Sequence, residues 1–477
     1  MGASCSTQRQ GNDSTWRTLR WFWSKTGQTL WGTRAWACKV ATDGVFQTNK
    51  HPVCPYLITD AKTACRIFDT QSIDQFVQRD GVRKIDKGGF MKHSLTGCTG
   101  DRWVDMRRRM KRDVFSKVLP ITNIPIANRV SKIMQNHFHQ AVSDGGKLNL
   151  KNVLVPLVAI WICELVLGKT CTASIRNSFI KHWIFLRRPQ RERSVRKENF
   201  EASRQANSPP TKTHFEHLLE EIEALDIAPG NDCLVAAMKA AGFSELEIKG
   251  NILSFLAAGF ETTLHITMTT LLMVAHKGSS SRYARTLQAH CVALCQDPHM
   301  NRKSIGELKA GKKNSTSGVP LGQAFPRSFS TGSTRLLSRS IVETLIAFPP
   351  VWDLPRKAKL RTLCPMLARK ALNIDCEQMV ECHIDLMCCN KVGPDPVRAW
   401  NPMSAIKAKN HLFSFGVGAR SCPAGSSALA AVHTFLCAIL SQFRLNRETS
   451  ASDVLDTSYL MPTLNFDGAL DVVVEVV

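Results

Sequence analysis

A glycine-punctuated loop near the C-terminus constrains this chain more than any other stretch. Residues 415–425 read Phe-Gly-Val-Gly-Ala-Arg-Ser-Cys-Pro-Ala-Gly and present one cysteine, Cys422, just before an apolar run over 428–440. Glycines let the backbone approach a bound group closely, and Arg420 supplies positive charge that favours a deprotonated sulfur. A helix expected to begin near Cys422 would add its N-terminal dipole. The loop predicts a thiolate metal ligand; a buried structural cysteine before a core helix is the alternative.

A second stretch predicts one long helix. Ser244 and Glu247 have the spacing of a capping box. The apolar pattern then continues to residue 276, which is about eight helical turns. A helix of that length crosses a whole domain.

The middle of this helix carries a polar motif, Ala-Gly-Phe-Glu-Thr-Thr, over 258–263. Ala258 and Gly259 leave little side-chain bulk on this part of the helix. Thr262 can kink the helix by bonding its own backbone, and Glu261 supplies an acid. Taken alone, the motif also fits a buried helix with a polar notch.

Together the two stretches resemble the signatures of the cytochromes P-450. The family's haem-binding loop reads Phe-Gly-x-Gly-x-Arg-x-Cys-x-Gly with an alanine six residues after the cysteine, and its matches here are Phe415, Gly416, Gly418, Arg420, Cys422 and Ala428. Only the last glycine differs, since Ala424 takes its place. The long helix matches the family's oxygen-side signature in full. The resemblance implies a mainly α (α+β) fold, with a single large helical domain and small β-sheets enclosing a haem.

The resemblance also implies roles for the matching residues. Cys422 would be the axial thiolate of haem b, which pushes electron density into the iron and favours O–O cleavage. Phe415 would shield that thiolate. Glu261 and Thr262 would relay protons on the oxygen side of the haem.

Four further positions are expected to bind haem propionates. Arg420 is one, and Trp103 with Arg107 resembles the family's Trp-x-x-x-Arg helix, whose spacing puts both side chains on one face. Arg108 could substitute for Arg107, and an exposed basic amphipathic helix is the alternative for the whole segment. Arg356 stands where relatives have another arginine that meets a propionate.

One motif of the family is degenerate. Glu343 begins its Glu-x-x-Arg pair, but Ile346 stands at the arginine position and Ser404 replaces a second arginine. A buried Glu343 would then cost roughly several kcal/mol or take up a proton. A cation from Lys357 or Lys359 is the alternative. The departure predicts low haem occupancy.

The chain is divided into two parts. Residues 1–49 form an atypical basic, tryptophan-rich segment without a transmembrane helix, because no apolar run there reaches about 18 residues. It is expected to bind membranes peripherally or to mark a truncated chain. Residues 50–477 form the haem domain, in which 277–340 is divergent or an insertion and is expected to form loops. Residues 153–168 predict a buried helix, and 472–477 a short closing strand.

Composition restricts the classes of partner that this chain is expected to bind. The net charge is +23, concentrated in basic runs, and 17 cysteines lack the regular spacing of a disulfide framework. A basic face and a reducing compartment follow, with no nucleic-acid motif. An acidic electron-donor protein would suit that face.

The resemblance implies a eukaryotic microsomal type of haem-thiolate monooxygenase. It would insert one oxygen atom of O2 into a lipophilic small molecule, with electrons from NADPH through a separate reductase, since the chain lacks a nucleotide fingerprint. It would lie peripherally on the cytoplasmic face of the endoplasmic reticulum, or in the cytoplasm. One alternative is a catalytically impaired P-450-derived haem binder, and another is a basic membrane or nucleic-acid scaffold without chemistry.

Overall fold

The computed structural model describes most of the helical part of the chain. The described residues are 45–47, 56–58, 63, 64, 67, 91–186, 214–225, 227, 232–315, 336–351, 353–357, 362–365, 371–374, 379–383, 400–403, 413–416, 418–447, 457–460, 463–466 and 470–477. The tryptophan-rich stretch expected to bind membranes lies outside these residues.

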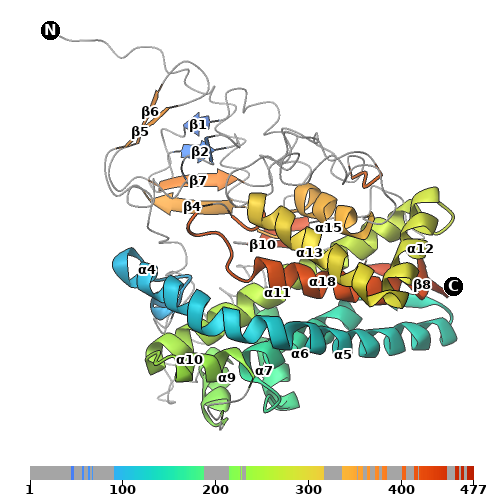
Figure 1. Ribbon diagram of the computed structural model, residues 1–477, viewed down its shortest axis with the longest axis horizontal. Helices are drawn as coiled ribbons and strands as arrows, with labels where there is room; N and C mark the ends of the chain where they lie inside the picture. The colour runs from blue at the N-terminus through green and yellow to red at the C-terminus, as the bar shows by residue number, and fades with distance from the viewer. Residues whose placement is uncertain are drawn as a thin grey trace, which may run out of the picture.

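Four helices form the centre of the fold: α5 (Ser116–Ser143), α6 (Leu150–Leu167), α11 (Glu245–Lys277) and α18 (Gly425–Leu440). Helix α6 contacts α5 and α11, and α18 contacts the same two helices from the other side (Figure 1). Most of their buried residues are apolar, with buried polar side chains such as Asn123 of α5 and Thr263 of α11 among them. The helix with the oxygen-side motif and the helix after the cysteine loop are therefore packed together.

Helix α6 confirms the predicted buried helix. By length and composition it is the one helix among the described residues that is apolar enough to cross a membrane, and 72% of it is buried within the protein. Because neighbours cover it on several sides, an all-apolar surface is what packing requires. Asn149 caps its first turn by accepting from two backbone amides.

Helix α11 confirms the long helix and its capping box. The Ser244 side chain accepts from the Glu247 amide, and Glu247 reaches back to the Ser244 amide. Gly259 also has a packing role that the sequence did not indicate. A Cβ at Gly259 would lie 2.5 Å from Cδ1 of Ile162 on α6, so this glycine permits close packing of two helices.

The loops expected over 277–340 are wrong for much of that region. It contains α12 (Arg282–Gln296) and α13 (Pro298–Ser315), and α15 (Leu336–Ala347) begins within it; residues 316–335 lie outside the described part. Ser281 caps α12, and the buried residues Tyr283, Leu287, Cys291 and Leu294 recur at helical spacing. Polar residues on the outer face obscured this pattern.

Shorter helices complete the α layer. They are η3 (Met91–His93), α4 (Gly100–Arg109), η4 (Met110–Phe115), α7 (Ala173–Leu186), α9 (His214–Glu223) and α10 (Leu234–Ala240). Helix α4 continues through the π-turn η4 directly into α5. The segment with Trp103 and Arg107 is thereby fixed to the central helices.

The strands form small sheets. A four-stranded sheet has the order β1 (Val45–Gln47), β2 (Tyr56–Ile58), β7 (Met379–His383), β4 (Asp353–Lys357), and a three-stranded sheet the order β3 (Lys147–Asn149), β11 (Asp471–Val476), β8 (Phe443–Asn446). Two hairpins pair β9 (Thr457–Leu460) with β10 (Thr463–Phe466) and β5 (Thr362–Pro365) with β6 (Ala371–Ile374). Among the strands that the structure describes, β2 and β7 alone pair in parallel.

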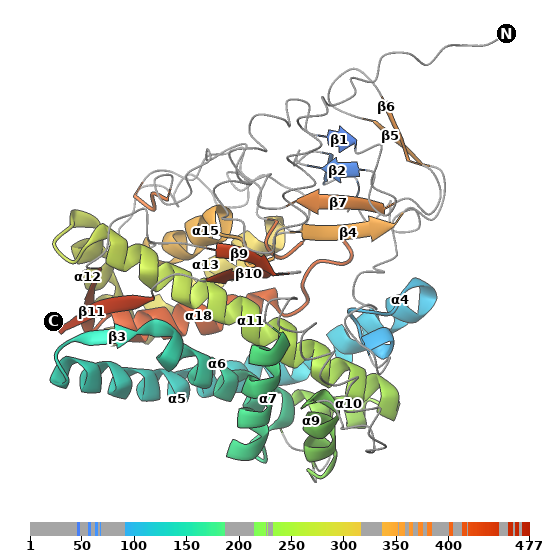
Figure 2. The same ribbon diagram turned by 180° about the vertical axis from the view of Figure 1, so that it is seen from behind.

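These sheets confirm the predicted fold class, a mainly helical domain with small sheets. Strand β11 is the predicted closing strand, and it pairs with both β3 and β8. The four-stranded sheet lies at one side of the helical body, away from α9 and α10 (Figure 2).

Candidate active site

The loop before α18 is a tight turn held by its own backbone. The Cys422 amide donates to the Phe415 carbonyl at 2.7 Å, and the Gly416 amide donates to the Phe413 carbonyl at 2.7 Å. Gly416 (φ 66°) and Gly418 (φ 72°) adopt the left-handed conformation that favours glycine. The turn leaves the Cys422 side chain half-buried.

Helix α18 begins three residues later than expected. Its first residue is Gly425 and its N-cap is Ala424, so Cys422 precedes the helix rather than starting it. Ala424 has φ −95°, a conformation that any L-residue adopts. The alanine at the family's glycine position therefore strains nothing in the backbone.

Arg107 on α4 reaches the cysteine loop. Its Nη2 donates to the carbonyl of Ser421, the residue before Cys422, at 2.7 Å. Burial lowers the pKa of Arg107, and the charge of the Cys422 thiolate opposes that fall. Arg108, in contrast, has a side chain that is 70% exposed and pairs with Asp105 at 2.8 Å. Of the two arginines, Arg107 is the one that contacts the cysteine loop, and which of them meets a propionate stays a prediction.

Arg420, a residue of the same loop, stacks on Trp103 of α4. The Arg420 guanidinium lies 4.3 Å from the centre of the Trp103 ring, a cation–π contact. Its Nη2 also donates to the Cys98 carbonyl at 3.0 Å. Trp103 is 4% exposed. Three of the residues expected at the propionates are therefore neighbours of the Cys422 loop, and their role toward a haem stays a prediction.

The motif on α11 has the expected local geometry. The Thr262 hydroxyl donates to the Ala258 carbonyl at 2.7 Å, which confirms the predicted bond to its own helix. Ala257 and Ala258 are exposed although the helix around them is largely buried, and Glu261 and Thr262 are half-buried. Helix α11 thus presents a strip of small side chains next to an acid and a hydroxyl.

This set of residues fits a haem better than a bare metal ion. Among the described residues no group of three or more His, Cys, Asp or Glu side chains is placed to hold a metal ion. Cys422 alone supplies a metal-ligating sulfur in the loop, and Arg107 and Arg420 supply cations of the kind that carboxylate groups require. A cofactor that brings its own metal ligands and two carboxylates matches that arrangement.

Arg356 is placed only by its backbone. It lies in β4 opposite Val380 of β7, and its side chain is outside what the structure describes, as are Ser404 and both candidate lysines' side chains. Its role at a propionate stays a prediction.

The sequence analysis missed a cation near Glu343. Arg339 lies one turn earlier on α15, and both side chains are buried, at 4% and 8% exposed. Burial lowers the pKa of Arg339, while the charge of Glu343 opposes the fall. Residues four apart on a helix are neighbours, so the Arg-x-x-x-Glu spacing was the available signal.

Helix α15 is also connected to the cysteine loop. The Ser414 hydroxyl donates to the Leu345 carbonyl at 2.7 Å, and Ser414 immediately precedes Phe415. On the same helix, the Thr344 hydroxyl accepts from the Trp400 indole at 3.1 Å and from Thr270 of α11 at 3.1 Å. Buried hydrogen bonds thus set the position of the loop relative to α15 and α11.

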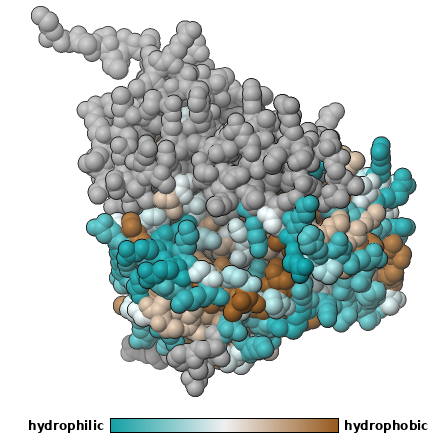
Figure 3. All heavy atoms as spheres, viewed as in Figure 1, coloured by the Kyte–Doolittle hydropathy of each residue, from teal (hydrophilic) through white to brown (hydrophobic). Residues whose placement is uncertain are grey.

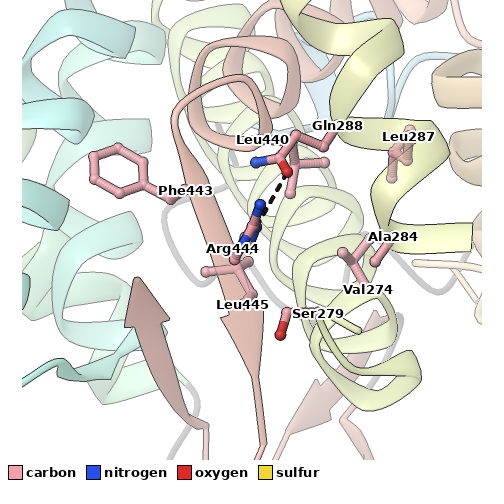
Figure 4. Close-up of a pocket in the computed structure, with 9 residues that line it drawn as sticks. All are labelled: Val274, Ser279, Ala284, Leu287, Gln288, Leu440, Phe443, Arg444 and Leu445. Carbon is pink, nitrogen blue, oxygen red and sulfur yellow. Dashed lines mark hydrogen bonds between the residues drawn. The ribbon is translucent and has the colours of Figure 1, made fainter. Parts of the chain in front are cut away.

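A small pocket lies elsewhere, between α12, the end of α18 and β8 (Figure 4). Leu287 and Leu440 line it, and Arg444 spans its mouth by donating to Gln288 at 3.4 Å. Neither Cys422 nor Thr262 contributes to it. This pocket is separate from the candidate active site.

The fold is mainly helical, and the candidate site combines a cysteine loop with nearby arginines. Residues 56–279 match the family model of cytochrome P-450, a segment that includes the α11 motif and ends before the Cys422 loop. The fold is similar to that of a crystal structure of a cytochrome P-450 (CYP102L1), with a TM-score of 0.65, 15% identity, and coverage of 94% of this chain and 95% of that chain. No curated protein matches the sequence. The family match is to residues 56–279, and the similarity to the solved structure shows the cytochrome P-450 fold; the general chemistry of that family is that of haem-thiolate monooxygenases.

Proposed function

We propose that the protein is a monooxygenase that inserts one oxygen atom of O2 into a lipophilic small molecule. Its electrons come from NADPH through a separate reductase. The observation that carries the proposal is the hydrogen bond from Arg107 to the Ser421 carbonyl, beside the Arg420–Trp103 stack. It brings cations to the one loop that presents Cys422. A haem bound there supplies an iron that activates dioxygen.

The side chains around the loop would hold that haem. Cys422 binds the iron through its sulfur, and Phe415 covers the thiolate. Arg107 uses one Nη atom for the Ser421 carbonyl, and a guanidinium carries five N–H donors. The remaining donors of Arg107 and Arg420 are suited to the propionates, with Trp103 and Arg356 as further partners.

Glu261 and Thr262 would move protons. The Thr262 hydroxyl donates its hydrogen bond to the Ala258 carbonyl. Its oxygen can still accept a hydrogen bond, and it would thereby orient a water or a hydroxyl group of a bound molecule. Glu261 is half-buried two positions after the glycine that packs on α6, where an acid exchanges protons with solvent.

Thr262→Ala tests the proton path. Haem content should stay at the wild-type level, while product formed per NADPH falls and peroxide rises. Thr267→Ala is the matched control, because Thr267 makes the same bond to its own helix but is fully buried. An unchanged product ratio in Thr262→Ala would refute the assignment.

An optical spectrum tests the function as a whole. The purified full-length protein, reduced under carbon monoxide, should show the red-shifted Soret band of thiolate-ligated haem. A weak or unshifted band would favour an impaired haem binder, and no haem band would leave a scaffold without chemistry.

The impaired haem binder is the second candidate, and Ile346 favours it. That side chain is 2% exposed within the apolar core, where relatives place a cation. In this case haem occupancy is low and rises in the double variant Ile346→Arg with Ser404→Arg by more than the sum of the single changes. Near-complete haem loading of the unmodified chain, with no gain in the double variant, would exclude it.

The basic face over α4 suits an acidic electron donor. Arg102 and Arg108 of α4 and Arg112 of η4 are exposed, and the surface over α4 is mostly hydrophilic (Figure 3). Reversing Arg108 and Arg112 to glutamate should slow reduction by the reductase and weaken its salt dependence. A rate that does not change would place the donor on another surface.

We further propose peripheral attachment at the cytoplasmic face of the endoplasmic reticulum, with a cytoplasmic chain as the alternative. The support is the tryptophan-rich basic sequence at the N-terminus. Deleting residues 1–45 should weaken binding to anionic vesicles and leave the optical spectrum unchanged. Undiminished binding would move the membrane contact elsewhere.

A further inference from the structure

Two thiols touch where α12 packs against α18. The Sγ atoms of Cys295 and Cys437 are 3.6 Å apart. That is van der Waals contact for sulfur, and a disulfide bond of about 2.05 Å requires them to approach by roughly 1.5 Å. Cys295 is exposed, whereas Cys437 is 2% exposed. The pair combines one sulfur that a dissolved oxidant reaches with a second that already contacts it.

The packing around the pair holds both sulfurs in place. Cys437 also donates to the Cys291 carbonyl at 3.6 Å. The small pocket described above opens on the same helix–helix interface, with Gln288 about two turns before Cys295 and Leu440 about one turn after Cys437 (Figure 4).

We propose that Cys295 and Cys437 are a redox-active pair that a peroxide converts into a disulfide joining α12 to α18. The Cys295 sulfur attacks the peroxide, the O–O bond breaks, and the products are a sulfenic acid and water. The Cys437 sulfur then attacks the Cys295 sulfur; the S–S bond forms, the S–O bond breaks, and a second water leaves with the Cys437 proton. Two thiols and one hydrogen peroxide thus give one disulfide and two waters.

The surroundings set the rate and the consequence of this reaction. The hydrogen bond with Cys437, together with burial, raises the pKa of the Cys295 thiol, and the contact with Cys291 raises that of Cys437. Thiols react with peroxide more slowly than thiolates do. Peroxide therefore oxidises the Cys295–Cys437 pair slowly at neutral pH. The cross-link joins positions 142 residues apart, and closing so long a loop restricts the unfolded chain. The disulfide form therefore resists unfolding more than the thiol form.

Peptide mapping of the peroxide-treated full-length protein tests the pair. After remaining thiols are blocked, trypsin cleaves at Arg285 and Arg302 around Cys295, and at Arg420 and Arg444 around Cys437. We expect these two peptides to become linked in a peroxide-dependent way and to separate again with dithiothreitol. The urea midpoint of the linked protein should also rise.

Cysteine variants distinguish this pair from its neighbours. Cys295→Ser and Cys437→Ser should abolish the link, whereas Cys291→Ser should retain it. Because Cys295 is exposed, its variant decides the test if Cys437→Ser fails to fold. Linking that persists in Cys295→Ser, or oxidation of Cys295 to sulfinic acid without linking, overturns the proposal.

An internal control is the buried pair Cys163 and Cys171. These thiols also interact with each other, but neither is exposed. They should stay reduced at peroxide concentrations that link Cys295 to Cys437. The proposal does not depend on haem binding, so a protein without a thiolate spectrum tests it equally well.

Discussion

The side chains near the two ends of α18 lie in different electrostatic environments. At its N-terminal end, Cys422 sits half-buried in a loop that Arg107 contacts. About 18 Å further along the helix, Cys437 is buried against other thiols and His433 is fully buried. One apolar helix separates the two sites, yet an arginine contacts the loop before its first turn, whereas its distal part is buried among neutral groups.

The pKa shifts show the same division. Near Cys422, burial lowers the pKa of Arg107, and the electrostatic interaction with Cys422 opposes that fall. In the distal half, burial lowers the pKa of His433 to about 3 and that of His290 to about 4, so both imidazoles are neutral at pH 7. Position relative to cations, rather than the presence of a cysteine, distinguishes a candidate metal ligand from a packing residue.

Cys422→Ala should have the largest effect, because it removes the only sulfur in the cationic loop. We expect complete loss of the thiolate Soret band and of oxygenation. Cys437→Ala is the matched control on the same helix and should keep the band. Equal spectra from the two variants would contradict the assignment of Cys422, rather than Cys437, as the thiolate ligand.

Arg339→Met should be the next largest. It removes the cation that lies one helical turn from the buried Glu343. A buried carboxylate left without a compensating cation lowers the free energy of unfolding by on the order of 3 kcal/mol. Urea denaturation measures the loss. A double variant with Glu343→Gln should recover most of it; if it does not, Arg339 contributes through packing instead.

Arg107→Gln should weaken haem binding, with a smaller effect than the two changes above. Loss of a charge-assisted hydrogen bond to the Ser421 carbonyl costs about 2 kcal/mol, and haem should dissociate roughly tenfold or more faster. Transfer of haem to an apoprotein acceptor gives the rate. Arg108→Gln, whose side chain is exposed, should match the wild type, and equal losses in both would argue for a general effect of charge.

His433→Gln should have the smallest effect and should appear only in acid. The folded pKa lies below that of an unfolded histidine, so its stabilising contribution is present above about pH 6.5 and is lost as the pH falls toward 3. Between pH 6 and 5 this amounts to about 1 kcal/mol per pH unit. Glutamine can keep the 3.0 Å contact to Ser304 without titrating, so its stability should fall less steeply. Identical slopes would assign the acid sensitivity to other groups.

Much of the local structure could be predicted from the sequence. The capping box of α11, the buried helix α6, the closing strand β11 and the turn before α18 are each encoded by residues adjacent in the chain. Short-range patterns fix such elements because their hydrogen bonds and apolar faces are local. Helices α12 and α13 escaped prediction because polar residues interrupt the apolar pattern over 277–315.

Sequence alone determined the family signatures, the thiol that precedes α18 and the acid–hydroxyl pair on α11. Tertiary structure decided which arginine reaches the loop, that Gly259 serves packing against Ile162, that Arg339 accompanies Glu343, and that Cys295 touches Cys437. The physical reason is distance along the chain. Contacts between residues tens to hundreds of positions apart depend on how helices pack, and packing follows from the shapes of complete buried faces rather than from any short motif.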